Sequence, residues 1–266
     1  MWGCTPLSQM CSRYTLASRP EAVEREFQTE FTYTFDPVYN ACPRMELPVI
    51  LSGEESRIVR LKWGLVPYWS KSFDGSYQQI NAYAGEVVRH PAFRSPLRLK
   101  RCLVPANCYI DWLRIAPGRV PHVVYFSDHR LFSMAGLWDL WIDRITGDRH
   151  LSFSLITTHA NNRLRPFLRR MPVIIPPSLR RSFLHPGTPV RDIMAMLRPF
   201  RSDTVNLYPI SPEIYHSRTN KRDLLLPVGE RLYPEHRYVP GVYLKLEGMG
   251  SGKDRSGHGS GLKQML

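Results

Sequence analysis

The sequence has no long hydrophobic run. None of its apolar stretches approaches the roughly 20 residues that a membrane-spanning helix requires, which excludes an integral membrane protein. The opening segment, MWGCTP, has neither the basic region nor the apolar region of a secretory signal. We therefore expect a cytoplasmic protein.

Cysteine is also scarce, and its spacing is uninformative. The 5 cysteines form no C-x-x-C pair, so the sequence signals neither a disulfide framework nor a zinc ribbon. We expect a reducing compartment, in which most of the thiols are small buried hydrophobic groups. The cysteines are Cys4, Cys11, Cys42, Cys102 and Cys108.

Acidic residues are too few to balance the basic ones. Lys and Arg number 36 against 23 Asp and Glu, a formal charge of +13. From Arg163 to Arg201 there are nine arginines and a single acid, Asp192. Arginine favours bidentate contacts with phosphate, so nucleic acid is the first candidate partner and an anionic membrane surface the second. The alternative is a basic soluble protein whose charge has no such role.

The remaining composition is that of an ordinary globular protein. With 266 residues, of which 43% are hydrophobic and 22% charged, the chain can bury a substantial core. Short apolar or alternating runs between Pro, Gly, Asn and Asp predict strands at Pro48–Leu51, Arg60–Leu65, Cys102–Pro105, Val120–Phe126, Leu131–Leu137, Ser152–Thr158, Val173–Ile175 and Thr204–Pro209. Helices are predicted at Arg19–Phe27, Ala84–Arg89, Asn161–Leu168, Pro177–Leu184 and Thr188–Leu197.

These elements predict a strand-rich α+β fold with a curved or barrel-like mixed sheet and flanking helices. We expect a single domain over residues 10–239. Residues 1–9 have no periodicity and are interpreted as an extension or pro-segment. Residues 240–266 are rich in Gly, Ser and Lys, and we expect a flexible basic tail there.

The dipeptide Met10-Cys11 has a chemistry of its own. If Met10 is the initiator and is removed, Cys11 carries both a free α-amine and a thiol. An amine of this kind has a pKa of about 7.7–8.0, and it can condense with an aldehyde to a Schiff base. The neighbouring thiol then closes on the imine carbon to form a thiazolidine. An internal cysteine cannot do this, because its nitrogen is an amide.

Cys11 lies in the first of nine segments that follow one another along the chain. The segments are MCSRYTL (10–16), YNACP (39–43), KWGLVPYW (62–69), INA (80–82), HPAFR (90–94), RCLVPANCYIDW (101–112), MAGLWD (134–139), TTHAN (157–161) and RRMPVI (169–174). Together they resemble the SOS-response-associated peptidase (SRAP) family, the abasic-site processing proteins, over Met10 to about Val228.

The resemblance implies catalytic roles for three residues. Cys11 matches the nucleophile, which in the family traps the aldehyde of an abasic site in single-stranded DNA as a thiazolidine crosslink. Asn81 matches the residue that positions the substrate and the amine. Asp111 stands where the family has an acid–base Glu, one methylene longer. The family is also regarded as thiol autopeptidases. The resemblance implies no cofactor and no metal, and we expect a monomer associated with the nucleoid when bound to damaged DNA.

Two further positions depart from the family pattern. The catalytic His of the family's I-H-x-R-M-P pattern is Leu168 here, and leucine cannot transfer a proton. General acid–base groups contribute about 10²–10⁴-fold to rates, so a step that needs this imidazole is slowed or lost. Rescue by His159, nine residues upstream, is not expected. Tyr83 replaces the Arg that usually follows Asn-Ala, so a phosphate contact is exchanged for a ring that can stack on a base.

The same matching indicates DNA-binding residues. Arg13 and Arg170 lie in matched motifs and can neutralise phosphates; the alternative is that each is a buried structural arginine. Pro43 and Trp69 match the apolar wedge that separates the strand at the lesion, where stacking on a base contributes about 1–3 kcal/mol. Other tryptophans lie in apolar strand patterns and are predicted to fill the core, namely Trp63, Trp112 and Trp138.

Three functional hypotheses follow from the sequence. The first is a DNA repair protein that captures abasic sites through Cys11, with crosslinking and lyase-type chemistry. The second is a degenerate paralogue that binds single-stranded DNA without efficient covalent catalysis, as Leu168 and Asp111 indicate. The third is a general thiol peptidase, which needs a Cys–His pair.

Overall fold

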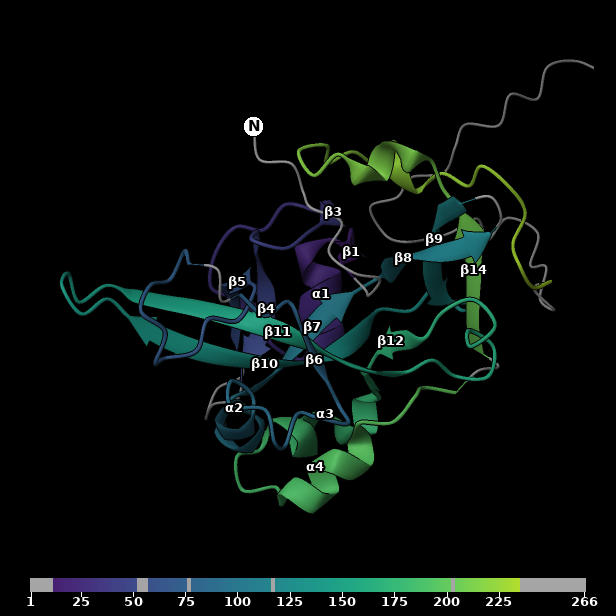
Figure 1. Ribbon diagram of the computed structural model, residues 1–266. Helices are drawn as coiled ribbons and strands as arrows, with labels where there is room; N and C mark the ends of the chain where they lie inside the picture. The colour runs from purple at the N-terminus through teal and green to yellow at the C-terminus, as the bar shows by residue number, and fades with distance from the viewer. Residues whose placement is uncertain (1–11, 52–56, 76–77, 116–117, 202–203, 235–266) are drawn as a thin grey trace, which may run out of the picture.

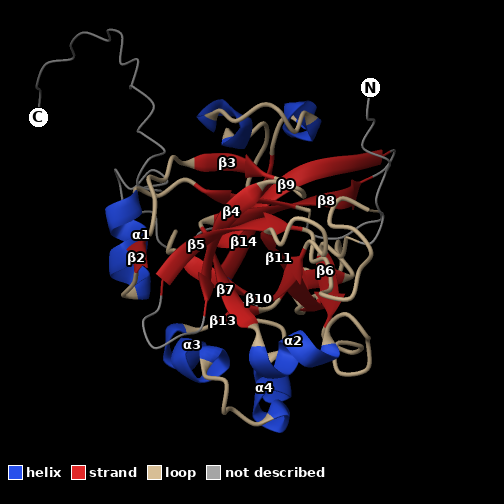
Figure 2. Cartoon of the chain, turned by 90° about the vertical axis from the view of Figure 1, so that its left-hand side faces the viewer, coloured by secondary structure: helices blue, strands red, loops and turns tan. Residues whose placement is uncertain are grey.

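The computed structural model describes residues 12–51, 57–75, 78–115, 118–201 and 204–234. Cys11, the predicted extension at residues 1–9 and the predicted tail at residues 240–266 lie outside these ranges. The described residues form two sheets, with α2, α3 and α4 gathered at one end and α1 at the side of the sheets (Figure 1, Figure 2).

The smaller sheet is five-stranded, in the order β14-β9-β8-β1-β3. Its neighbouring strands are antiparallel, and β1 lies between β8 and β3 with hydrogen-bonded partners on both sides. Arg13 of β1 pairs with Ile110 of β8, which places the start of β1 beside the middle of β8. The strands are β1 (Arg13–Leu16), β3 (Val38–Ala41), β8 (Cys108–Ile115), β9 (Gly118–Phe126) and β14 (Val205–Pro209).

The larger sheet closes on itself as a five-stranded barrel. Neighbours β11, β10, β7, β4 and β5 are antiparallel, and a parallel contact between β5 and β11 closes the ring at Lys62–Ser152 and Trp63–Phe153. The barrel strands are β4 (Glu46–Leu51), β5 (Arg57–Trp63), β7 (Arg101–Ala106), β10 (Phe132–Ile142) and β11 (Arg149–His159). Short strands are attached to them, β2 (Glu30–Phe31), β6 (Asn81–Tyr83), β12 (Arg170–Pro172) and β13 (Ile174–Ile175). The prediction of a strand-rich α+β fold around a barrel-like mixed sheet is confirmed.

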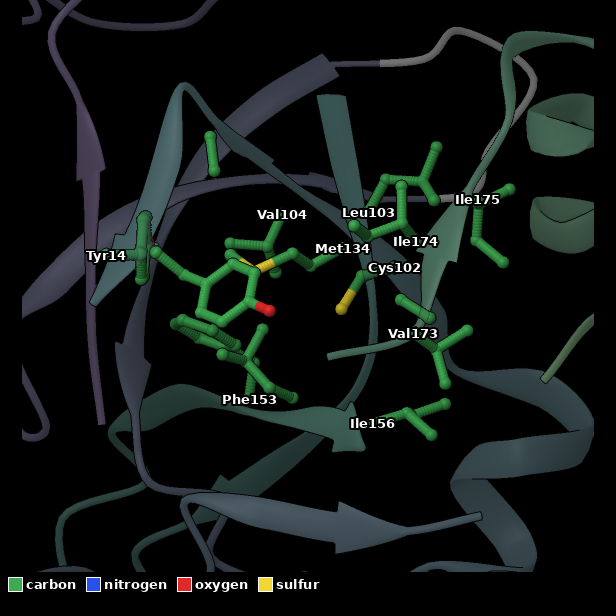
Figure 3. Close-up of a cluster of buried hydrophobic side chains, with 14 of the residues drawn as sticks. Tyr14, Cys102, Leu103, Val104, Met134, Phe153, Ile156, Val173, Ile174 and Ile175 are labelled. Carbon is green, nitrogen blue, oxygen red and sulfur yellow. The ribbon is translucent and has the colours of Figure 1, made fainter. Parts of the chain in front are cut away.

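The main core lies inside the barrel and between the two sheets. Trp63 stacks on Phe153 across the closing contact, with ring centroids 6.1 Å apart. The ring of Tyr14, from β1, lies 5.3 Å from that of Trp63. Figure 3 shows Tyr14 and Phe153 converging with Cys102, Val104 and other apolar side chains. Cys102 and Cys108 are buried, as predicted for small hydrophobic groups, and burial raises the pKa of each thiol. Trp63 fills the core, whereas Trp112 and Trp138 are half-buried at its margin.

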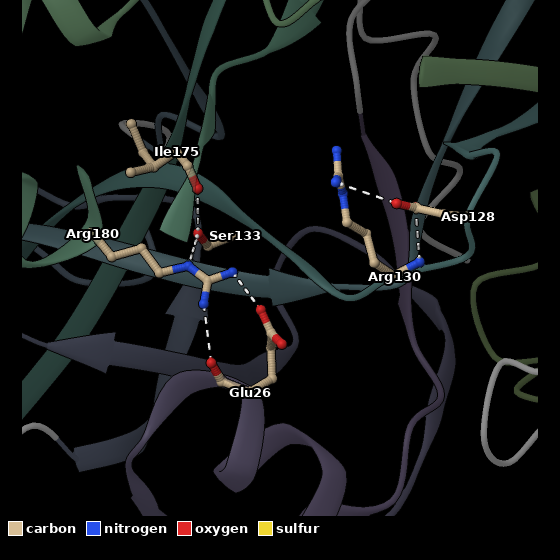
Figure 4. A network of polar contacts seen from close by, with 6 residues as sticks. All are labelled: Glu26, Asp128, Arg130, Ser133, Ile175 and Arg180. Carbon is tan, nitrogen blue, oxygen red and sulfur yellow. Dashed lines mark hydrogen bonds and ion pairs between the residues drawn. The ribbon is translucent and has the colours of Figure 1, made fainter. Parts of the chain in front are cut away.

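Within the described ranges, four helices and the 3₁₀ turns η2 and η3 surround the sheets. Helices α2, α3 and α4 gather on one side of the barrel, and the β10–β11 hairpin projects beyond it (Figure 1). Arg180 of α3 links this group to α1, because its guanidinium contacts the Glu26 carboxylate at 2.8 Å and donates to the Glu26 carbonyl (Figure 4). The elements are α1 (Pro20–Phe27), α2 (Arg94–Leu99), α3 (Pro177–Leu184), α4 (Val190–Met196), η2 (Pro212–Tyr215) and η3 (Arg222–Leu225).

Two predicted helices are wrong. Residues 84–89 form a hydrogen-bonded turn after β6, and the following His90-Pro91 does not favour a longer helix. Residues 161–168 form successive turns, since Pro166 has no N–H to continue a helical ladder. Asn161 nevertheless caps the first of these turns, because its Oδ1 accepts a hydrogen bond from the Leu164 amide at 3.0 Å.

None of the helices in the part of the chain that the structure describes is long and apolar enough to cross a membrane.

Candidate functional site

Asp111 is a buried carboxylate at the wall of a pocket. It lies in the middle of β8, where its neighbours Tyr109 and Leu113 on the same face are apolar, and only 4% of it is exposed. Its Oδ1 accepts a hydrogen bond from the Trp112 amide at 2.8 Å. The pocket has a volume of about 220 Å³. It is lined by Asp111, Trp112, Arg114, Arg119, Arg165, Pro166, Phe167, Leu168 and Arg169.

Two opposing effects set the pKa of Asp111. Burial penalises the ionised carboxylate, whereas the Trp112 amide and the charge of Arg119 favour it. Burial is the larger effect and raises the pKa of Asp111 from 3.8 to about 7. A carboxyl group with this pKa can both give and take a proton near neutral pH, which is what a general acid–base group requires.

Residues 165–169 also line the pocket. Here Leu168 is buried, with 7% of it exposed, and contributes an apolar surface. Arg165 and Arg169 on either side of it are exposed, as are Arg114 and Arg119 on the sheet. The pocket therefore joins a buried acid to four cationic side chains, an arrangement suited to an anionic ligand.

A second cluster forms where β6, β11 and β12 meet. Tyr83 pairs with Thr157, and Arg170 pairs with His159, which brings three side chains together at the end of β11. The Tyr83 hydroxyl lies 2.6 Å from His159 Nε2, and the Arg170 guanidinium carbon is 4.0 Å from the centre of the Tyr83 ring. The structure thus brings together Tyr83 and Arg170, both predicted to bind DNA, and adds the exposed His159.

Asn81 begins β6, two residues before this cluster. It lies opposite Leu155 in the parallel pairing with β11 and is half-buried. Tyr83 of the cluster and Asn81 both belong to β6, which pairs with β11 along its whole length. The backbone of β11 therefore positions two of the predicted site residues, Asn81 and Tyr83.

The predicted wedge residues lie in loops. Trp69 follows β5 by six residues and is 42% exposed, next to Tyr68, which is 62% exposed. The loop is fixed because the Tyr68 amide donates to the buried Asp139 carboxylate at 3.0 Å, and Lys100 pairs with the same carboxylate. Pro43 is half-buried, two residues after the end of β3.

Arg13 is a buried arginine in the structure. Its Nε and NH2 groups donate to the carbonyls of Ile214 and Tyr215 at 3.4 and 3.2 Å. Only 6% of the residue is exposed. Its guanidinium thereby joins the start of β1 to η2, which is the alternative role that the sequence left open.

Sequence reasoning missed the cationic residues of the pocket on the sheet. Arg114 and Arg119 pair with each other on β8 and β9 and lie outside the arginine-rich segment, so no local signal identified them. Among the described residues, no group of three or more His, Cys, Asp or Glu side chains could hold a metal ion.

These observations define a class of protein: a mixed α+β barrel with a buried acid in a cationic pocket next to its first described strand. Residues 10–217 match the SOS response associated peptidase (SRAP) family, so the chain belongs to that family.

Several proteins of known sequence or structure are similar to this chain. The Bacillus subtilis abasic site processing protein YoqW is 30% identical over 222 residues, covering 81% of this chain and 99% of that protein. The abasic site processing protein HMCES of Gallus gallus is 25% identical and covers 73% of this chain and 67% of that protein. A crystal structure of a Bacteroides thetaiotaomicron protein superposes with a TM-score of 0.75 at 27% identity, over 82% of this chain and 99% of that one.

Proposed function

We propose that this protein captures abasic sites in single-stranded DNA through Cys11, once the residues before it have been removed by autoproteolysis or by methionine processing. Asp111 carries the proposal, because it is a buried acid with a pKa of about 7 on the strand that pairs with Arg13, two residues after Cys11. The relatives named abasic site processing proteins support the substrate class.

The proposed reaction needs one group that gives and then regains a proton. The amine of Cys11 adds to the sugar aldehyde, and its proton moves to oxygen to give a carbinolamine. Asp111 protonates the departing hydroxyl, which leaves as water, and a C=N bond forms. The sulfur then bonds to that carbon, the C=N electron pair returns to nitrogen, and the thiol proton returns to Asp111. The products are a thiazolidine and one water.

The DNA strand is proposed to follow the basic pocket and the Tyr83 cluster. The exposed Arg165 and Arg169 can neutralise phosphates, and the Tyr83 ring can stack on a base with Arg170 against its other face. Trp69 supplies a further aromatic surface. Asn81, two residues before Tyr83 on β6, is proposed to position the substrate.

The proposal is tested by incubating the protein with an oligonucleotide that contains one abasic site and looking for an SDS-resistant protein–DNA band on a gel. A chain beginning at Cys11 should form the band, and the variant Cys11→Ala should not. The full 266-residue chain should form it only after intact mass shows the loss of residues 1–10. A normal yield from Cys11→Ala, or from a chain that keeps residues 1–10, would refute the proposal.

A second candidate function is reversible binding of single-stranded DNA without covalent capture. Leu168 favours it, because this buried apolar side chain faces the pocket and can transfer no proton. This function predicts salt-sensitive binding and no crosslink even from a chain that begins at Cys11. The SDS assay distinguishes the two.

A further inference from the structure

Two exposed aromatic side chains, Tyr68 and Trp69, occupy the central positions of one tight turn. The turn runs from Pro67 to Ser70 and is closed by the Ser70 amide, which donates to the Pro67 carbonyl at 2.9 Å. Of Tyr68 62% is exposed, and of Trp69 42%. Aromatic side chains gain free energy when they are covered. Two neighbouring rings on one turn therefore offer a surface that a ligand can cover.

The backbone of this turn is fixed at both ends by the β10–β11 hairpin. Before the turn, the Val66 amide donates to the buried Ser152 hydroxyl of β11 at 2.9 Å. At its end, the Ser70 carbonyl accepts a hydrogen bond from Trp141 Nε1 of β10 at 2.8 Å. A binding surface that is ordered before its ligand arrives loses less conformational entropy on binding.

A buried carboxylate holds the turn between these two ends. Asp139 lies within β10, and only 1% of it is exposed. Its Oδ2 accepts from the Tyr68 amide at 3.0 Å, whereas its Oδ1 accepts from the Leu140 amide at 2.9 Å and pairs with Lys100 Nζ. Both oxygens of Asp139 are therefore satisfied, and one of them is committed to the turn. A buried carboxylate is costly without such partners, so this arrangement is strongly favoured.

The charge around the turn favours a nucleic acid strand as the ligand. From Gly64 to Phe73 the only charged residue is Lys71, which is exposed and lies two residues after Trp69. The next acid along the chain, Asp74, is paired with Lys62 at 2.6 Å. Aromatic rings on which bases stack, next to a cation that can meet phosphate, are typical of surfaces that bind single-stranded nucleic acid.

We propose that Tyr68 and Trp69 together form a stacking platform for bases of single-stranded DNA, and that Asp139 is the positioning residue that holds this platform through the Tyr68 amide. The identity of the ligand rests on the proposed function. Tyr68 adds a second ring to the wedge that the sequence predicts at Trp69. Asp139 does not touch the DNA and acts only through the backbone of the turn.

The first experiment measures fluorescence anisotropy of a labelled single-stranded oligonucleotide without an abasic site, mixed with the full chain. This DNA has no aldehyde for Cys11, so the assay reports reversible binding alone. Tyr68→Ala should weaken binding at least about fivefold, the lower end of what one stacked base contributes. Tyr68→Phe retains the ring and should bind within about twofold of the unaltered chain. Unchanged affinity for Tyr68→Ala would overturn the platform.

The second experiment tests Asp139 by substitution to Asn in two backgrounds. Asn replaces one acceptor oxygen by an NH₂ group, which cannot accept from the Tyr68 amide while the remaining oxygen serves Lys100 and Leu140. Affinity should fall at least about threefold in the otherwise unaltered chain, because a loosened turn must be ordered on binding. In a chain that already carries Tyr68→Ala and Trp69→Ala, the same substitution should have no further effect, since no ring remains to be positioned.

The matched control is Asp143→Asn, at the exposed end of the same hairpin, which should leave affinity unchanged in both backgrounds. Equal losses for Asp139→Asn in the two backgrounds would show that it acts by another route and would overturn the positioning role. If Asp139→Asn does not fold, Trp141→Phe takes its place in the same comparison, because it removes the hydrogen bond to the Ser70 carbonyl and keeps an aromatic ring.

The outcomes separate this proposal from the proposed function. If the unaltered chain forms the SDS-resistant band but Tyr68→Ala binds undamaged DNA normally, the platform is wrong and covalent capture stands. If the ring variants weaken binding but a chain that begins at Cys11 forms no band, the platform stands and covalent capture fails. If the unaltered chain does not bind the undamaged strand at all, the platform is overturned, whatever the SDS assay shows.

Discussion

Replacing Asp111 by Asn should raise the free energy of unfolding relative to that of the unaltered chain, by an amount that increases with pH. Asparagine keeps the shape of the side chain and an oxygen that accepts from the Trp112 amide, but it has no ionisable group. The unaltered carboxyl has a pKa of about 7 in the folded chain against the ordinary 3.8. This difference corresponds to about 4 kcal/mol at about 1.36 kcal/mol per pKa unit.

The direction follows from the protons bound by each state. Below about pH 4 Asp111 is protonated in the folded and the unfolded chain, so its ionisation does not affect stability. Between about pH 4 and about pH 7 the unfolded chain releases a proton that the folded chain keeps, and unfolding becomes progressively easier. Above about pH 7 the full cost of up to about 4 kcal/mol is present.

The assay is urea unfolding, followed by tryptophan fluorescence at several pH values from about 4 to about 8.5. The free energy of unfolding of the Asn variant minus that of the unaltered chain should increase across this range. A suitable control is Asp143→Asn, because hydrogen bonds from the Ile145 and Thr146 amides lower the pKa of Asp143. The stabilising effect of Asp143 is lost only below its ordinary pKa of 3.8, so the difference for the control should stay flat across this range. A flat or decreasing difference for Asp111→Asn would mean that burial does not dominate the pKa of Asp111.

Three further predictions concern the DNA-binding surface and the pocket. Trp69→Ala should weaken binding of single-stranded DNA by about 1–3 kcal/mol in fluorescence anisotropy, whereas Trp69→Phe should retain most of it; equal affinities for the two variants would exclude stacking. Tyr83→Ala should lose affinity in the same assay because the ring is removed, and Tyr83→Phe should not, since it loses only the hydrogen bond to His159; a loss with Phe would assign the effect to the hydroxyl. Leu168→His should speed turnover of the crosslink by about tenfold or more, measured as release of free DNA, and an unchanged rate would show that position 168 has no part in proton transfer.

The barrel could be predicted from the sequence because its strands are apolar and bounded by turn residues. Cys102–Pro105 and Ser152–Thr158 are predicted from such runs and lie within β7 and β11. The short strands β6 and β12 could not be predicted in this way. Each has three residues and exists because β11 offers it a hydrogen-bonding edge, which is a property of the fold and not of the local sequence.

The site was predictable only in part. The motifs drew attention to Asp111 and Leu168, and the structure places both at one pocket. They did not show that Asp111 is buried enough to have a pKa of about 7, because burial depends on the residues that cover β8. Arg119 was missed because its proximity to Asp111 arises from the pairing of β8 with β9, which no spacing in the sequence reveals.

The position of β1 has a practical consequence for anyone who attaches another protein to this chain. With β8 on one side and β3 on the other, the strand holds Arg13 in place, and the described chain begins at Ser12, beside the strand that carries Asp111. A protein attached before Ser12 is therefore tethered on the Asp111 side of the fold, whereas residue 234 ends the described chain beside β14, through the contact of Tyr233 with Asn206. Labels and affinity handles belong at the carboxyl end.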